Sequence, residues 1–249
     1  MASDLYINHS GNHNVGGGSH SGILIGAATS NSGKTTFTMG LLRALSRRGV
    51  SVQPFKCGPD YIDPMYHRQA SVRESVNLDT FMSSPDHVRD LYHRYGAETD
   101  MRVVEGVMGL YDGSDKWHGS SAEIAMLLDI PVVLLVNAKS TAYSVAPLIH
   151  GFKTFTPPPT SFIHQTRPLN VAGVVFNMVA SANHYSFLRE ACEDAGVECL
   201  GYMARNEELQ IPSRHLGLTI TGRETMERLI NAAADEVDRH VNIERIMQL

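Results

Sequence analysis

Short apolar runs recur along the chain, and most of them end in a polar or glycine-rich segment. The clearest run is PVVLLV, residues 131–136, in which no polar residue interrupts the apolar side chains. A continuously apolar run of this length is typical of a strand that is covered on both faces, as in a parallel sheet. Strands are predicted over residues 23–28, 50–56, 101–104, 131–136, 171–176 and 197–202.

Helical periodicity fills most of the intervals between these runs. Phe37, Leu41 and Leu45 recur at the spacing of one helix face, and Gly49 is placed to end that helix. Helices are predicted over residues 33–48, 85–95, 121–128, 141–150, 184–195 and 223–236. The expected caps are Ser84 or Asp86 for the second helix and Ser120 or Ser121 for the third. This alternation predicts an α/β fold with a mainly parallel sheet flanked by helices.

Two proline-rich segments between these elements are expected to be irregular. In FKCGPDYIDPMYH, residues 55–67, the residues Gly58, Pro59 and Pro64 argue against a regular element. Residues 156–170, TPPPTSFIHQTRPLN, are expected to form a surface loop rather than a domain boundary.

The composition of the chain fits a domain that needs neither disulfides nor a structural metal. Of its 249 residues 43% are hydrophobic and 19% are charged, so a sizeable core can form. The net charge of −5 argues against a general affinity for nucleic acid. The three cysteines match no disulfide framework or metal motif, which favours a reducing compartment such as the cytoplasm.

Composition also separates a leader from the domain. Residues 1–21 are rich in Ser, Asn, His and Gly, and we expect them to be a flexible leader because they have little to pack. The alternative is that His9, His13 and His20 bind a metal. Residues 22–249 then form the domain. We expect no membrane association, because no stretch is long and apolar enough to cross a bilayer.

One segment has the order strand, small-residue turn and helix that is typical of a phosphate loop. It is ILIGAATSNSGKTT and starts at Ile23. Free backbone amides and the positive end of the helix dipole would meet near Gly33. Lys34 is placed to reach the β- and γ-phosphates of a nucleotide, and the Thr35 hydroxyl to bind Mg²⁺. The strict motif has Gly where this chain has Ala28, so a Ser/Gly turn before an ordinary helix is the alternative.

Three other strands end in polar residues, and we expect all of these ends at one edge of the sheet. Lys56 ends the second strand, Glu105 follows the third and Asn177 follows the fifth. A buried carboxylate such as Glu105 is costly without a cation, and Mg²⁺ is the natural cation beside a phosphate loop. A helix cap or a surface ion pair is the alternative for Glu105. The loop after the second strand adds ionisable side chains, for which a solvated turn is the alternative: Asp60, Tyr61, Asp63 and His67.

Several strings of the sequence resemble the cobyrinate a,c-diamide synthases, which are enzymes of cobalamin biosynthesis. The strings are VQPFKCGPDYIDP, NLDTFM, VVEGVMGLYDG, SSAEIAMLLDIPVVLLV, GVVFNMV and IPSRHLGL. Those that contain GPDYIDP and EGVMGLYDG are the most specific, and the resemblance runs from about residue 22 to residue 245. It implies a P-loop NTPase fold of the dethiobiotin synthetase type, and the fold family suggests a homodimer.

The resemblance implies an amidation that depends on ATP and Mg²⁺. The family converts the a and c acetate carboxylates of the corrinoid cobyrinate to amides, with ammonia drawn from glutamine. Its members usually continue into a glutaminase domain, whose nucleophilic cysteine lies in a Gly-flanked turn. None of the three cysteines in this sequence lies in such a turn. We therefore expect the ammonia to come from a glutaminase domain or subunit outside this chain, with a loss of activity as the alternative.

The resemblance also implies roles for individual residues. Nucleotide binding is expected of Ser32, Gly33, Lys34, Thr35, Thr36, Asn177 and Arg205. Binding of Mg²⁺ is expected of Thr35, Asp60 and Glu105. Catalytic roles near the substrate carboxylate and the transferred phosphate are expected of Lys34, Lys56, Asp60, Tyr61 and Asp112.

Two other functions fit part of the pattern. Nucleotide-dependent switch ATPases of the partition and metal-delivery type share the phosphate loop, but they have no evident need of Lys56, Asp60 and Asp63 in one cluster. The substrate could also be another tetrapyrrole, such as nickel sirohydrochlorin. The retained Lys34, Thr35 and Glu105 argue against an inactive remnant.

Overall fold

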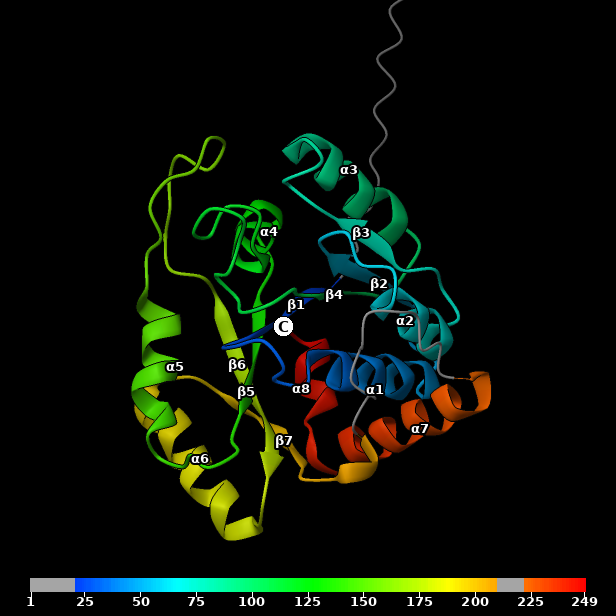
Figure 1. The fold of residues 1–249 in the computed structure, drawn as a ribbon, viewed down its shortest axis with the longest axis vertical. Helices are drawn as coiled ribbons and strands as arrows, with labels where there is room; N and C mark the ends of the chain where they lie inside the picture. The colour runs from blue at the N-terminus through cyan, green and yellow to red at the C-terminus, as the bar shows by residue number, and fades with distance from the viewer. Residues whose placement is uncertain (1–20, 210–221) are drawn as a thin grey trace, which may run out of the picture.

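Within residues 21–209 and 222–249, which the computed structural model describes, seven parallel strands form one sheet with helices on both faces (Figure 1). The strand order is β3-β2-β4-β1-β5-β6-β7, and every neighbouring pair is parallel. The strands are β1 (Ser21–Ala27), β2 (Val52–Cys57), β3 (Val76–Leu78), β4 (Met101–Glu105), β5 (Val132–Asn137), β6 (Val171–Val179) and β7 (Cys199–Ala204). The predicted parallel α/β architecture is confirmed.

Successive side chains of each strand point to opposite faces of the sheet, so the hydrophobic core has two halves, one on each face. In β1, Ile23 and Ile25 belong to one half and Leu24 to the other. The helices of the first half are α1 (Lys34–Arg47), α2 (Asp63–Ser71), α7 (Arg223–His240) and α8 (Ile243–Met247). Those of the second are α3 (Pro85–Gly96), α4 (Ser121–Leu128), α5 (Val145–Thr154) and α6 (Ala182–Ala195). Because both faces are covered, the strands need apolar side chains on both sides, which explains the continuous apolar runs.

Two helix caps settle the alternatives left open by the sequence. Ser84 caps α3, and its hydroxyl accepts a hydrogen bond from the His87 N–H. Ser120 caps α4 in the same way, through the N–H of Glu123. The proline-rich connection at 156–170 contains no helix or strand, as predicted.

Two predicted boundaries are wrong. Residues 55–67 are not irregular throughout, because α2 begins at Asp63 and includes Pro64 in its first turn. A proline there lacks only an N–H that the first turn of a helix leaves without a partner, so it favours the start of the helix rather than blocking it. The helix predicted over 141–150 is α5, which begins at Val145 after a turn.

Besides α2 and the 3-10 helix at Glu207–Leu209, two short elements were not predicted. The strand β3 has 3 residues and α8 has 5, so neither is long enough to show a period. The leader was predicted to end at residue 21, but Ser21 is the first residue of β1. Residues 1–20, and residues 210–221 with the whole IPSRHLGL string, lie outside the described ranges. Among the described helices, none has the length and apolar character needed to cross a membrane.

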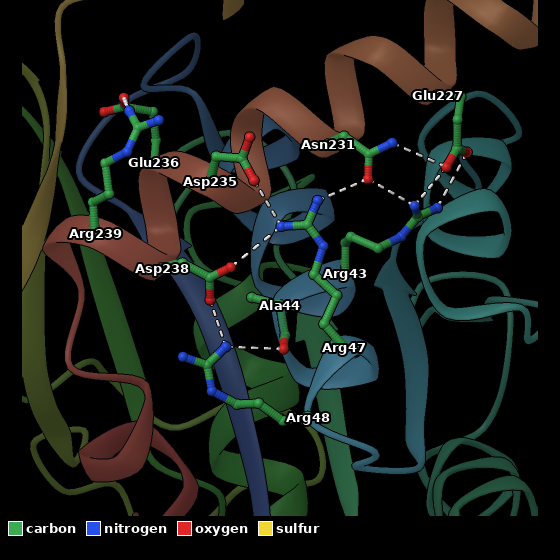
Figure 2. A network of polar contacts seen from close by, with 10 residues as sticks. All are labelled: Arg43, Ala44, Arg47, Arg48, Glu227, Asn231, Asp235, Glu236, Asp238 and Arg239. Carbon is green, nitrogen blue, oxygen red and sulfur yellow. Dashed lines mark hydrogen bonds and ion pairs between the residues drawn. The ribbon is translucent and has the colours of Figure 1, made fainter.

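Helix α7 packs along α1 and is tied to it by the charged and amide side chains drawn in Figure 2. We call this group the α1–α7 ion-pair network: Arg43, Arg47, Arg48, Glu227, Asn231, Asp235 and Asp238. The helices approach closely at Gly40, where a Cβ would lie 2.8 Å from the carbonyl oxygen of Ala233. The helix that follows the phosphate loop is therefore supported along its length by α7.

Candidate functional site

The phosphate loop joins β1 to α1, and contacts from within the loop and from β6 fix its shape. Gly33 has a φ of 92°, and a Cβ on it would lie 2.2 Å from Nδ2 of Asn177. This Nδ2 donates a hydrogen bond of 2.8 Å to the carbonyl of Ser32, whose hydroxyl donates to the carbonyl of Thr29 at 2.7 Å. Glycine is therefore required at position 33, and α1 opens without a side-chain cap, as an anion site at a helix N-terminus requires.

Lys34, the first residue of α1, has a largely buried side chain. Its Nζ donates a hydrogen bond to the carbonyl of Met108, in the loop after β4. Burial lowers the pKa of Lys34, while the nearby Glu105 acts to raise it. An incoming phosphate would offset the cost of keeping this ammonium charged, so the position favours an anionic ligand.

Four ionisable side chains meet beside the phosphate loop, and we call them the buried ionic cluster: Lys56, Asp63, His67 and Glu105. The Nζ of Lys56 lies 2.9 Å from Oδ2 of Asp63 and 3.0 Å from Oε1 of Glu105. The Nε2 of His67 lies 2.6 Å from Oε2 of Glu105. Thr35 donates its hydroxyl hydrogen to Oε1 of the same carboxylate at 2.8 Å. Both oxygens of Glu105 thus have partners, as a fully buried carboxylate requires.

Strand register and helix periodicity explain how these residues meet. Lys56 and Glu105 are register partners on the neighbouring strands β2 and β4. Asp63 and His67 are four residues apart on α2, so they share one face of that helix. The other ring nitrogen of His67, Nδ1, lies 3.0 Å from the Ser75 hydroxyl, and this contact orients the ring toward Glu105.

Opposite charges control the ionisation of the cluster. Burial acts to raise the pKa of Glu105, but Lys56 and His67 outweigh it and hold that pKa well below its usual range. Burial acts to lower the pKa of Lys56, and Glu105 and Asp63 reverse this effect and raise it. Burial and the neighbouring Glu105 raise the pKa of Asp63 to about 6. Lys56 and Glu105 are therefore a charged pair at neutral pH.

Asp60 shapes the loop between β2 and α2. Its Oδ1 accepts hydrogen bonds from the N–H groups of Ile62 at 2.8 Å and Asp63 at 3.2 Å. Its carbonyl accepts a hydrogen bond of 2.9 Å from Nδ2 of Asn77. Burial acts to raise the pKa of Asp60, but these N–H groups, the Asp63 side chain and Lys56 together lower it. Asp60 is therefore an ionised carboxylate that holds the start of α2.

A cavity of about 770 Å³ adjoins the phosphate loop and the buried ionic cluster. Its volume is typical of a site for a nucleotide-sized ligand. Most of the predicted site residues line it, namely Gly33, Lys34, Thr35, Thr36, Lys56, Asp60, Glu105 and Asn177. The structure therefore brings together the four strand ends that the sequence singled out.

The other predicted site residues do not line this cavity. Tyr61 is 82% exposed. Asp112 is exposed, and its Oδ2 accepts a hydrogen bond of 3.0 Å from the N–H of Gly109. Arg205 is exposed, and Ser32 is buried within the phosphate loop. The roles assigned to these four residues stay predictions.

Several contributors to the site had no predicted role. His67 was noted only as an ionisable residue of its loop. Asn137, Lys139 and Asn206 line the cavity without having been singled out. A signal was available for Asn137, because it ends β5 and is the register partner of Asn177. Asn177 was predicted as a site residue because it follows an apolar strand, and Asn137 has the same kind of position.

Most of the chain matches one known protein family. The model of the CbiA family, described as the CobQ/CobB/MinD/ParA nucleotide binding domain, matches residues 23–218. The chain belongs to this family. The match begins at the first core residue of β1 and includes the phosphate loop and every residue of the buried ionic cluster.

Curated relatives of the chain carry consistent names. The hydrogenobyrinate a,c-diamide synthase of Brucella anthropi is 40% identical over 92% of this chain and 50% of its own length. The cobyrinate a,c-diamide synthase of Streptococcus sanguinis is 40% identical over 91% of this chain and 49% of its own length. The chain thus spans about half the length of the curated relatives it matches.

A solved structure supports the fold assignment. Chloroplast FtsY from Physcomitrella patens superposes with a TM-score of 0.53 over 86% of this chain and 66% of that chain. Its sequence is 12% identical, so the likeness concerns the fold alone. Together with the CbiA match and the phosphate loop, it identifies the chain as a P-loop NTPase domain that binds a nucleotide.

The residues at the cavity fit the Mg²⁺ ion that accompanies nucleotides in such domains. Within the described ranges, no group of three or more His, Cys, Asp or Glu side chains could hold a metal ion. Mg²⁺ does not need such a group, because it binds through one or two protein oxygens, water and the phosphates of its substrate. The Thr35 hydroxyl donates to Glu105, which leaves its oxygen lone pairs as ligands, and the Asp60 carboxylate lines the same cavity.

Proposed function

We propose that this chain catalyses the ATP- and Mg²⁺-dependent amidation of the a and c acetate carboxylates of cobyrinate, in cobalamin biosynthesis. The names of its relatives support the substrate class. One observation carries the proposal: beside the phosphate loop, the Thr35 hydroxyl and the Lys56 ammonium both donate hydrogen bonds to Glu105. A switch ATPase needs the phosphate loop, but a second buried lysine at the same cavity suits the transfer of a phosphoryl group to a carboxylate.

The chemistry requires activation of the carboxylate. A carboxylate does not react with ammonia at neutral pH, because its carbonyl is deactivated and oxide is a poor leaving group. Transfer of the γ-phosphoryl of ATP to a carboxylate oxygen gives an acyl phosphate and ADP. Ammonia then attacks the acyl carbon, phosphate leaves and the amide remains. The protein contributes mainly by positioning the reactants and neutralising charge.

The residues at the cavity divide this work between them. The amide groups at Gly33 and the N-terminus of α1 hold phosphate, and Lys34 leaves the Met108 carbonyl to contact the β- and γ-phosphates. Thr35 and Asp60 would hold Mg²⁺ with Glu105 behind them, and the ion would neutralise phosphate charge. Lys56 stabilises the transferring phosphoryl, since Glu105 and Asp63 keep it charged.

The ammonia is proposed to come from a glutaminase domain or subunit. Burial raises the pKa of the Cys57 thiol to about 12, so this cysteine is a poor nucleophile at neutral pH. Neither Cys192 nor Cys199 lines the cavity. We also propose a cytoplasmic location and a homodimer, which the reducing-compartment argument and the fold family favour respectively.

A switch ATPase is the competing proposal, because the matching family description includes MinD and ParA. The two proposals differ in what stimulates ATP turnover. An amidating enzyme releases ADP when its carboxylate substrate and ammonia are present. A switch releases ADP on self-association or on binding a partner protein.

The test is an amidation assay on the chain with ATP, Mg²⁺ and a panel of tetrapyrrole acids: cobyrinate, hydrogenobyrinate and nickel sirohydrochlorin. We expect ammonium salts to support amide formation and ADP release, and glutamine to fail, with products identified by mass spectrometry. Lys34→Ala should abolish turnover, whereas Arg47→Ala, on the far part of α1, should retain it. Amidation with glutamine would contradict the proposed ammonia source. ATP-driven dimerisation with no amidation of any acid would favour the switch.

A further inference from the structure

Two large apolar side chains lie next to each other in an exposed turn after β3. Phe81 is 70% exposed and Met82 is 71% exposed. They belong to residues 79–82, which we call the β3 turn. Side chains of this size are normally withdrawn from water, so their exposure as a pair requires an explanation.

The side chains of Asp79 and Thr80, the two residues before the exposed pair, hold the β3 turn in place through hydrogen bonds. Asp79 accepts hydrogen bonds through Oδ1 from the N–H groups of Phe81 at 2.8 Å and Met82 at 3.2 Å. The Thr80 hydroxyl donates to Oε2 of the fully buried Glu123 at 2.6 Å. The exposed pair is therefore presented by a fixed backbone rather than by a loose loop.

Glu123 extends this support to the loop before α4. Its Oε2 also accepts a hydrogen bond of 2.7 Å from the N–H of Gly119. Its Oε1 lies 2.8 Å from Nδ1 of His118. A Cβ placed on Gly119 would lie 3.7 Å from Cβ of Phe81, so the two loops are in contact. One buried carboxylate thus fixes the surroundings of Phe81 from several directions.

The β3 turn lies at the same sheet edge as the proposed phosphoryl-transfer site. Lys56, which lines the cavity, is the register partner of Asn77, two residues before the turn. The side chain of Asn77 also donates to the carbonyl of Asp60, and the N–H of Gly58 donates to the carbonyl of Leu78 at 2.9 Å. Neighbouring strands are about 4.8 Å apart, so the turn begins about one strand spacing from the edge of the site.

We propose that Phe81 and Met82 form the surface that receives the apolar face of the tetrapyrrole macrocycle. This inference rests on the amidation proposed above. A macrocycle of four five-membered rings is wider than one strand spacing. Its ring can therefore lie on the β3 turn while an acetate arm reaches Lys56 and Asp60 in the cavity. Aromatic and thioether side chains are suited to such a face, because they combine large apolar area with polarisable contacts.

The size of the patch favours a small molecule over a protein partner. A stable protein interface takes roughly 800 Å² from each partner and about 20–30 residues a side. The other highly exposed aromatic residue of this edge is Tyr61, in the loop that follows β2. Three large exposed side chains in neighbouring loops at one edge of the sheet amount to a ligand surface, not to an interface of that size.

The test combines Phe81→Ala and Met82→Ala in one variant and measures cobyrinate binding by absorbance titration. We expect the dissociation constant for cobyrinate, and its KM in the ammonia assay, to rise about tenfold or more. The KM for ATP and the melting temperature should not change, because both side chains are exposed. Phe187→Ala on α6 is the matched control, since Phe187 is also exposed, at 44%, and lies on another element.

The possible results separate the two proposals. If the unmodified chain amidates cobyrinate and the double variant binds it equally well, the surface is wrongly assigned and the proposed function stands. If the unmodified chain neither binds nor amidates any tetrapyrrole acid, both proposals are wrong. If the double variant changes the oligomeric state in gel filtration and leaves cobyrinate binding intact, the turn is a subunit contact and the inference is overturned.

Discussion

The buried ionic cluster and the α1–α7 ion-pair network use the same kinds of side chain for different purposes. The ion pairs of Lys56 with Asp63 and Glu105 have side chains that are at most 5% exposed. The pair of Arg47 with Asp235 has side chains that are 36% and 50% exposed. Water can replace a lost partner in the network but not in the cluster. The cluster should therefore be sensitive to single substitutions, and the network should not.

The position of each group on the sheet agrees with this difference. The cluster lies where β2 and β4 end beside the phosphate loop, and its charges face the cavity. The network lies between the helices α1 and α7 (Figure 2), and its Arg47, Asp235 and Asp238 side chains are partly exposed to solvent. Apolar side chains would cost less to bury than the charged side chains of the cluster. We infer that the cluster keeps its charges because the proposed reaction needs them.

The largest expected effect comes from removing the buried cation. Lys56→Met should lower the free energy of unfolding by about 3–5 kcal/mol, because it leaves the buried carboxylates of Glu105 and Asp63 without their counter-ion. It should also abolish amidation. Urea denaturation followed by circular dichroism measures the first effect.

The matched control for this variant is Arg47→Met in the network. It should cost less than about 1 kcal/mol and leave amidation unchanged. Similar losses of stability for both substitutions would mean that burial does not separate the two groups, and the comparison would be wrong.

A smaller effect is expected from the histidine of the cluster. His67→Ala removes the partner of Oε2 of Glu105, and it should cost about 1.5–3 kcal/mol because the lost hydrogen bond involves a charged group. It should also raise the Mg²⁺ concentration needed for ATP binding by about 10–100-fold, because His67 holds Glu105, and Glu105 in turn orients the proposed Mg²⁺ ligand Thr35.

Fluorescent-nucleotide titration at varied Mg²⁺ measures this second effect. His67→Asn, which keeps a donor, should recover part of it. Val88→Ala, a buried substitution on α3, is the control for simple destabilisation. If Val88→Ala shifts the Mg²⁺ dependence as far as His67→Ala does, His67 has no orienting role.

The smallest effect is expected from acidifying the network. Hydrogen bonds from Arg43 and Gln69 lower the pKa of Glu227 to about 2, from an ordinary value of 4.5. A carboxylate whose pKa is lowered in the folded state stabilises the fold at pH values above its ordinary pKa. This contribution is lost as the pH falls from about 4.5 to 2. Because the side chain is 36% exposed, the change should stay below about 1 kcal/mol.

Glu227→Gln should remove this part of the pH dependence and little else, as followed by urea midpoints at several pH values. An unchanged slope between pH 4.5 and 2 would show that another carboxylate is responsible. A loss of several kcal/mol at pH 7 would place the network in the same class as the cluster.

The sequence predicted the main parts of the site because they follow simple rules. Buried strands are mostly apolar, so polar residues such as Lys56 and Glu105 at the end of an apolar run mark the strand ends. Parallel strands then bring those ends to one edge. His67 had no predicted role because its partners, Glu105 and Ser75, meet it only after α2 has packed on the sheet.

The missed helix has a different cause. Pro64 was interpreted as a helix breaker, although the same residue is favoured in the first turn of a helix. Asp63 and His67 have the four-residue spacing of a helix face, which could have identified α2. The predicted role of Asn177 in nucleotide binding stays a prediction. In the structure its amide group holds the phosphate loop, a contact that pattern alone does not reveal.

The support of α1 by α7 has a consequence for how the protein folds. Arg43 and Asn231, which are hydrogen-bonded between these helices, lie 188 residues apart in the chain. Contacts between such distant residues form late, because the intervening chain must first be ordered. During synthesis the phosphate loop leaves the ribosome well before α7 exists to cover the back of α1. The phosphate-binding segment is therefore among the first parts of the domain to be made and among the last to be fixed in place.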